Sequence, residues 1–155
     1  MTSAAGHRLL AFLRALPAAT TWTVVTDEIG DLSRWRLSGS TWRAVVDVEP
    51  RRWLGMQFEA WEPATGRRAT YDIDTDLYDI SRDEQREFAG EIERDILEFL
   101  GNLRNRAVLR GTDGSKFVLV FPQDGAQVRV VRGRFMTTVS TRAAAWTGGA
   151  LVPVA

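Results

Sequence analysis

Hydrophobic residues recur at two different spacings along this chain, and the changes between these spacings constrain the fold more than any other feature. Near the start, the apolar residues follow helical spacing: Leu9, Leu10, Phe12, Leu13 and Leu16. This pattern predicts a short amphipathic helix over residues 4–16, ended by Pro17. From Thr21 the spacing changes to two, which predicts a run of antiparallel strands.

The clearest of these strands runs from Trp53 to Trp61. On one of its sides lie only apolar residues, namely Leu54, Met56, Phe58 and Ala60. The preceding strand has a similar face made of Trp42, Ala44, Val46 and Val48. A third strand, Arg68 to Ile73, follows the turn at 63–66. The apolar faces of the strand from Trp53 to Trp61 and of the strand before it are expected to point into a core.

Helical spacing returns after Ser81. Ser81 and Glu84 have the spacing of a capping box, so we expect a helix from Arg82 to about Asn105. Its apolar residues project onto one broad face: Phe88, Ala89, Ile92, Ile96, Phe99, Leu100 and Leu103. This long helix is the second one predicted.

The last third of the chain again shows strand patterns. Residues 117–121 and 128–131 are strongly apolar, and the Asp124-Gly125 pair between them is typical of a hairpin turn. A third strand is predicted over 135–141. We interpret residues 110–114 as a turn, and we expect residues 1–4 and 147–155 to be loosely held.

The order helix, strands, helix, strands predicts an α+β fold. We expect an antiparallel sheet of about six to eight strands, with the short N-terminal helix and the long helix packed on it. A length of 155 residues, 45% of them hydrophobic, is suited to a single domain over 1–155.

Few residues are available for catalysis. The single histidine, His7, is near the chain start, where we expect it to face solvent, and there is no cysteine. Residues 110–114 lack the spacing of a phosphate loop. We therefore expect no catalytic residue and no cofactor, and we predict that the protein is not an enzyme.

A run of carboxylates precedes the long helix, formed by Asp72, Asp74, Asp76 and Asp79. In an extended segment the first three would lie on one side, where oxygen ligands could bind Ca²⁺ or Mg²⁺. The run does not fit a calcium-loop motif, since Leu77 stands where such a loop has glycine. The favoured interpretation is a solvated segment without a metal, and a divalent-metal-binding module or enzyme is the alternative.

The long helix also carries an acidic stripe, composed of Glu84, Glu87, Glu91, Asp95 and Glu98. At helical spacing these residues lie within about 80° of one another, and like charges four residues apart repel. The stripe is thus either a solvated face flanked by Arg86 and Arg94 or a surface for a basic partner.

Two tryptophans share the polar side of one strand, Trp53 and Trp61, with Gln57 and Glu59 between them. Half-exposed aromatic residues are frequent anchors of protein interfaces. The alternative is that the first helix or the tail around Trp146 covers them. We predict that both tryptophans and the acidic stripe contact a partner protein.

A small α+β domain without a catalytic set resembles the immunity proteins of bacterial polymorphic toxin systems. The segment from Ser81 through Glu87-Phe88-Ala89 and Ile92-Glu93 to Gly101 is similar to the immunity factor of a mycobacterial NAD-hydrolysing toxin. This resemblance implies inhibition of a cognate toxin. The order of elements also resembles secretion chaperones, which bind a partner chain on a sheet.

The remaining expectations concern the partner and its location. Twenty basic and twenty acidic residues give no net charge that would attract nucleic acid or a membrane. We therefore expect a protein partner, and the two resemblances imply that it is a toxin or a secreted substrate. The absence of cysteine is compatible with the cytoplasmic location that we expect. The sequence leaves the oligomeric state open.

Overall fold

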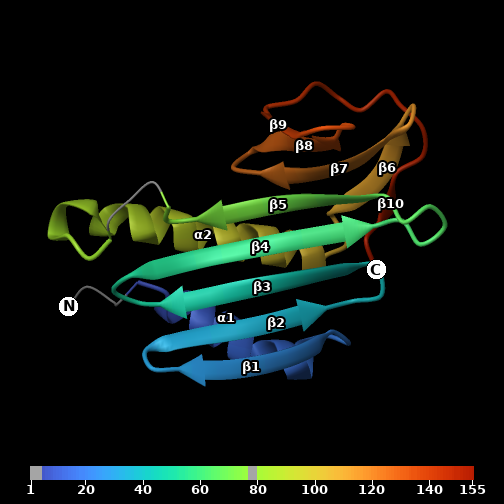
Figure 1. Ribbon diagram of the computed structural model, residues 1–155. Coiled ribbons are helices and arrows are strands. Elements are labelled where there is room, and N and C mark those ends of the chain that lie inside the picture. Colours follow the sequence, from blue (N-terminus) through green and yellow to red (C-terminus); the bar gives the residue numbers. More distant parts are fainter. Residues whose placement is uncertain (1–4, 77–79) are drawn as a thin grey trace. The chain divides into compact units, whose positions relative to one another are not determined.

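The computed structural model describes residues 5–76 and 80–155 and has an α+β fold (Figure 1). In the described ranges it contains two helices and two antiparallel sheets of five strands each. The α+β class is therefore confirmed, whereas the expected single sheet of six to eight strands is wrong. The strands Leu109–Asp113 and Val152–Pro153 were not predicted, and with them the strands that follow the long helix form a sheet of their own.

The elements follow one another as α1 (His7–Ala19), β1 (Thr23–Ile29), β2 (Leu32–Ser38), β3 (Trp42–Glu49), β4 (Trp53–Trp61), β5 (Arg68–Asp74), the 3₁₀ turn η1 (Asp83–Gln85), α2 (Arg86–Arg104), β6 (Leu109–Asp113), β7 (Lys116–Gln123), β8 (Ala126–Arg132), β9 (Thr137–Thr141) and β10 (Val152–Pro153). The strands of the first sheet are ordered β1-β2-β3-β4-β5 and those of the second β10-β6-β7-β8-β9.

Residue contacts group the chain into two compact units, which we describe one at a time. The first unit comprises residues 1–39, 43–58 and 72–97, and the second comprises 40–42, 59–71 and 98–155. The single domain expected over 1–155 stays a prediction.

In the first unit, α1 lies behind strands β1 to β3 (Figure 1) and buries Leu9, Leu13 and Leu16. Gly6, with φ 88°, allows the helix to start close to the sheet, because a Cβ there would be 2.7 Å from Val48 Cγ1.

The bounds expected for α1 need correction at both ends. The helix starts at His7 and continues through Pro17 to Ala19. A proline this close to the C-terminus of a helix removes only one late backbone hydrogen bond. The Thr20 N–H and hydroxyl both donate to the Leu16 carbonyl, at 3.0 and 2.9 Å, where the helix ends.

Strands β1, β2 and β3 pair so that one face is apolar and the other polar. Trp35 lies opposite Val46, and Leu37 opposite Ala44, and all four side chains are buried. On the other face, Arg34 donates to both carboxylate oxygens of Asp47, at 2.8 and 3.1 Å. The alternation predicted for β3 and β4 is confirmed, since their apolar sets are buried.

The long helix begins later than its sequence pattern predicts. Arg82, with extended backbone angles, occupies the cap position in place of Ser81, and a 3₁₀ turn precedes α2. The Gln85 N–H closes this turn by donating to the Arg82 carbonyl at 3.0 Å. Because the start is shifted by one residue, Glu84 does not have the capping-box position expected for it.

The second unit contains the second sheet and an aromatic cluster. The rings of Tyr71, Phe99 and Phe121 lie 4.8 to 5.5 Å apart between centroids. The hairpin turn between β7 and β8 is confirmed, with positive φ at both Asp124 (53°) and Gly125 (74°). The segment 110–114, predicted as a turn, instead belongs mainly to strand β6, and the chain turns at Gly114 with φ 61°.

The C-terminal tail, which we expected to be loosely held, makes several contacts within the second unit. Arg129 stacks on Trp146 at 5.1 Å and donates to the Ala144 carbonyl at 2.9 Å. Further on, β10 pairs with β6, and Val154 is buried. In the part of the chain that the structure describes, no helix has the length and apolar character needed to cross a membrane.

Candidate functional site

The predicted acidic stripe is distributed over both units. In the first unit, Glu84, Glu87 and Glu91 are exposed and Asp95 is half-buried. Glu84 belongs to the 3₁₀ turn, and the others belong to α2. Three carboxylates on the solvent side of this segment are therefore accessible to a partner.

Glu98, the last member of the stripe, belongs to the second unit and has a structural role there. One of its carboxylate oxygens accepts the Asp124 N–H at 2.8 Å, and the other accepts from the Gln123 amide at 3.4 Å. Glu98 thus supports the β7–β8 hairpin turn. Sequence spacing within the helix gave no sign of this contact, because the turn lies about 26 residues further along the chain.

Glu93 is a buried carboxylate in the first unit that the sequence analysis did not single out. It is 4% exposed and accepts the Leu9 N–H at 3.2 Å and the Arg8 Nε–H at 3.3 Å. The Leu9 N–H belongs to the first turn of α1, which has no side-chain cap of its own. A signal was present, since Glu93 is flanked at helical spacing by the buried residues Ala89 and Ile96.

Trp53 and Trp61 are both half-buried, but they belong to different units. In the first unit, the Trp53 ring lies over Gly55, where a Cβ would be 2.7 Å from the indole Nε1. In the second unit, the Trp61 N–H donates to the Thr41 carbonyl at 3.0 Å. Their common role in partner binding stays a prediction.

Among the carboxylates before the long helix, Asp72 and Asp74 belong to the end of β5, and Asp76 follows in a turn. Asp74 accepts the Asp76 N–H at 3.0 Å, while Asp79 lies outside the described residues. Asp72 is exposed, but surrounding protein atoms displace part of its hydrating water, and this, and to a smaller extent the neighbouring Asp74, raises the pKa of Asp72. Among the described residues, no three acidic or histidine side chains are grouped so that they could hold a metal ion. His7 is exposed, as predicted.

The second unit presents an open strand edge that the sequence analysis did not identify as a site. Strand β9 is the last strand of its sheet and pairs with β8. Phe135 and Met136, directly before β9, are 87% and 66% exposed, and Val139 within it is 46% exposed. Apolar exposure of this size beside a strand edge is typical of a binding surface.

No protein-family model, curated protein or solved structure matches this chain.

Proposed function

We propose that this chain is a non-catalytic protein-binding domain that receives an extended segment of its partner along the edge of β9. The exposure of Phe135 and Met136 beside this edge is the observation that supports the proposal. A partner strand added here would gain main-chain hydrogen bonds from β9 and would cover the two apolar side chains.

The charge around β9 indicates the chemistry of the partner segment. Residues 132–142 include Arg132, Arg134 and Arg142 and contain no acidic residue. A segment with both apolar and acidic side chains would therefore be complementary to this edge.

The class of partner follows from the resemblance described for the sequence. We propose a toxin that the chain neutralises in the cytoplasm, as an immunity protein does. A secreted protein bound by a chaperone-like domain is the alternative, and both would use the same edge.

The experiment measures binding of the purified chain to the products of genes adjacent to its own. Replacing Phe135 and Met136 together by serine should weaken binding by about thirtyfold, as expected for central interface residues. Ile29→Ser in the first unit is the matched control, because Ile29 is also an exposed apolar residue, at 58%.

Two results would contradict this proposal. An unchanged Kd for the Phe135/Met136 double variant would remove β9 from the interface. Catalytic turnover that is lost in Asp74→Asn would show that the chain is an enzyme.

Glu87→Lys and Glu91→Lys are tested in parallel, and slower association of these variants would place the predicted acidic stripe in the interface.

A further inference from the structure

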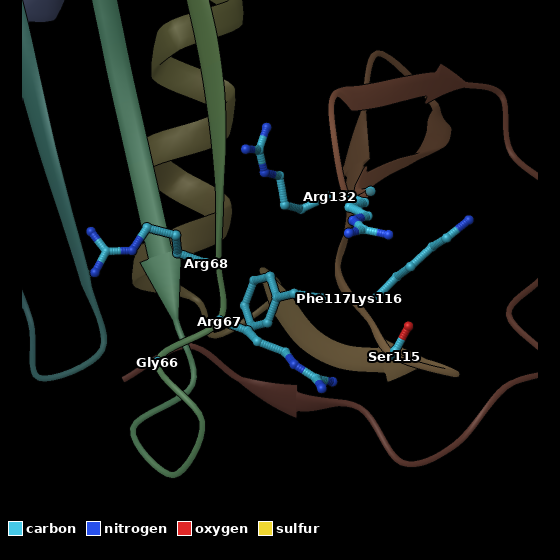
Figure 2. A pocket seen from close by; sticks show the side chains of 9 residues that line it. Gly66, Arg67, Arg68, Ser115, Lys116, Phe117 and Arg132 are labelled. Atoms are coloured by element: carbon cyan, nitrogen blue, oxygen red, sulfur yellow. The ribbon is translucent and has the colours of Figure 1, made fainter.

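A cavity of about 470 Å³ opens in the second unit (Figure 2). Three short segments line it, residues 66–68, 115–117 and 132–134. Together they contribute five cationic residues: Arg67, Arg68, Lys116, Arg132 and Arg134. Since the whole chain carries no net charge, this is a strong local concentration of positive charge.

Local structure fixes each of these segments. Phe117 and Arg132 are opposite each other in the β7–β8 pair, and Phe117 is buried. Two bonds hold the turn before β5: Gly66 N–H to the Glu62 carbonyl and Glu62 N–H to the Arg67 carbonyl, both 2.8 Å. The Gly133 N–H donates to the Met136 carbonyl at 2.8 Å and holds the third segment. The cationic side chains therefore extend from an ordered backbone.

Most of the positive charge around the cavity is not balanced by the protein. Arg68 pairs with Glu59 at 3.4 Å, and Figure 2 shows Arg67 and Arg68 projecting in opposite directions. Arg132 donates to the Thr137 hydroxyl at 3.3 Å, which does not neutralise it. In the described ranges, no carboxylate forms an ion pair with the other cationic residues of the cavity.

We infer that this cavity binds a small ligand that carries two or more phosphate groups in succession. Four cationic residues from three segments, Arg67, Lys116, Arg132 and Arg134, line the cavity, and their like charges attract an anion to it. A guanidinium binds phosphate through two parallel hydrogen bonds, and several guanidinium groups match several neighbouring phosphates. The cavity volume is within the range of small-ligand sites. This site goes beyond the proposed interface along β9 but shares Arg132 and Arg134 with it, whereas Arg67 and Lys116 belong to the cavity alone.

The test is calorimetry of the whole chain with sodium tripolyphosphate as the probe, in about 0.1 M salt so that distant charges are screened. We expect saturable binding at one site. Arg67→Gln and Arg132→Gln should each weaken it by about tenfold or more, because each removes a charged hydrogen-bonding group. Arg14→Gln, at an exposed position of α1, removes the same charge elsewhere and should leave binding unchanged.

Arg67→Gln keeps the test decisive if Arg132→Gln disturbs the fold, since the Arg67 side chain is exposed and at a turn. A nucleoside triphosphate and a single-stranded oligonucleotide are titrated alongside. Tighter binding of the nucleotide than of tripolyphosphate would identify a nucleotide as the source of the phosphates. The inference is overturned if tripolyphosphate does not bind, if only the oligonucleotide binds, or if Arg14→Gln weakens binding as much as Arg67→Gln.

Discussion

Replacing Glu93 by alanine should destabilise the protein far more than replacing any exposed carboxylate of the same helix. Glu93 accepts the Leu9 N–H at 3.2 Å, and that N–H has no partner within α1, whose first backbone bond joins the Leu10 N–H to Gly6. A hydrogen bond to a charged group contributes about 1.5–3 kcal/mol, and a negative charge at a helix N-terminus adds about 0.3–1 kcal/mol. We therefore expect Glu93→Ala to lower the free energy of unfolding by about 3 kcal/mol.

The ion pair with Arg8 should account for little of this loss. The Arg8 side chain is 64% exposed, and exposed pairs contribute about 0–1 kcal/mol. Glu93→Gln keeps an oxygen acceptor for the Leu9 N–H without the charge, so its cost should be intermediate, about 1–2 kcal/mol.

The assay is urea unfolding monitored by tryptophan fluorescence, together with calorimetric melting. For a chain of this size, 3 kcal/mol corresponds to a decrease of about 6–12 °C in Tm. Glu91→Ala, at an exposed position two residues earlier, is the matched control and should change stability by less than about 0.5 kcal/mol. If Glu93→Ala and Glu91→Ala have equal effects, or if Arg8→Ala costs as much as Glu93→Ala, the assignment of Glu93 as the cap of α1 is wrong.

Two further predictions concern glycines and a carboxylate. Gly101→Ala, within α2 and with open space around the added Cβ, should stabilise the protein by about 0.5–1 kcal/mol. Gly125→Ala, at φ 74°, should destabilise it by about 1–2 kcal/mol. Urea unfolding of the two variants checks this prediction, and effects of the same sign would contradict it. Because the pKa of Asp72 is raised, the folded protein holds the proton of this carboxyl more tightly than the unfolded chain does. The contribution of Asp72 to stability therefore falls as the pH rises above 3.8, the ordinary pKa of the group. The free energy of unfolding of Asp72→Asn should therefore increase relative to that of the wild type as the pH rises through this range. If urea unfolding gives a difference between the two that is independent of pH, the pKa of Asp72 is not raised.

Much of the secondary structure could be predicted from the sequence because it depends on local patterns. Strand β4 has the bounds that its alternation predicted, and the Asp124-Gly125 pair forms the expected turn. The candidate sites were harder to predict from the sequence. Glu98 looked like a surface carboxylate on a helical projection, yet it supports a turn distant in sequence.

The sequence alone determined both helices and most of the strands, through the periodicity of apolar residues, although the helix bounds shifted by a few residues. Only the tertiary structure decided how the strands divide into two sheets, since β6 and β10 are too short or too polar to have a periodic signal. It also decided that Glu93 is a buried cap and that residues 66–68, 115–117 and 132–134 surround one cavity. These features depend on contacts between residues far apart in the chain, and such contacts leave no spacing in the sequence from which they could be read.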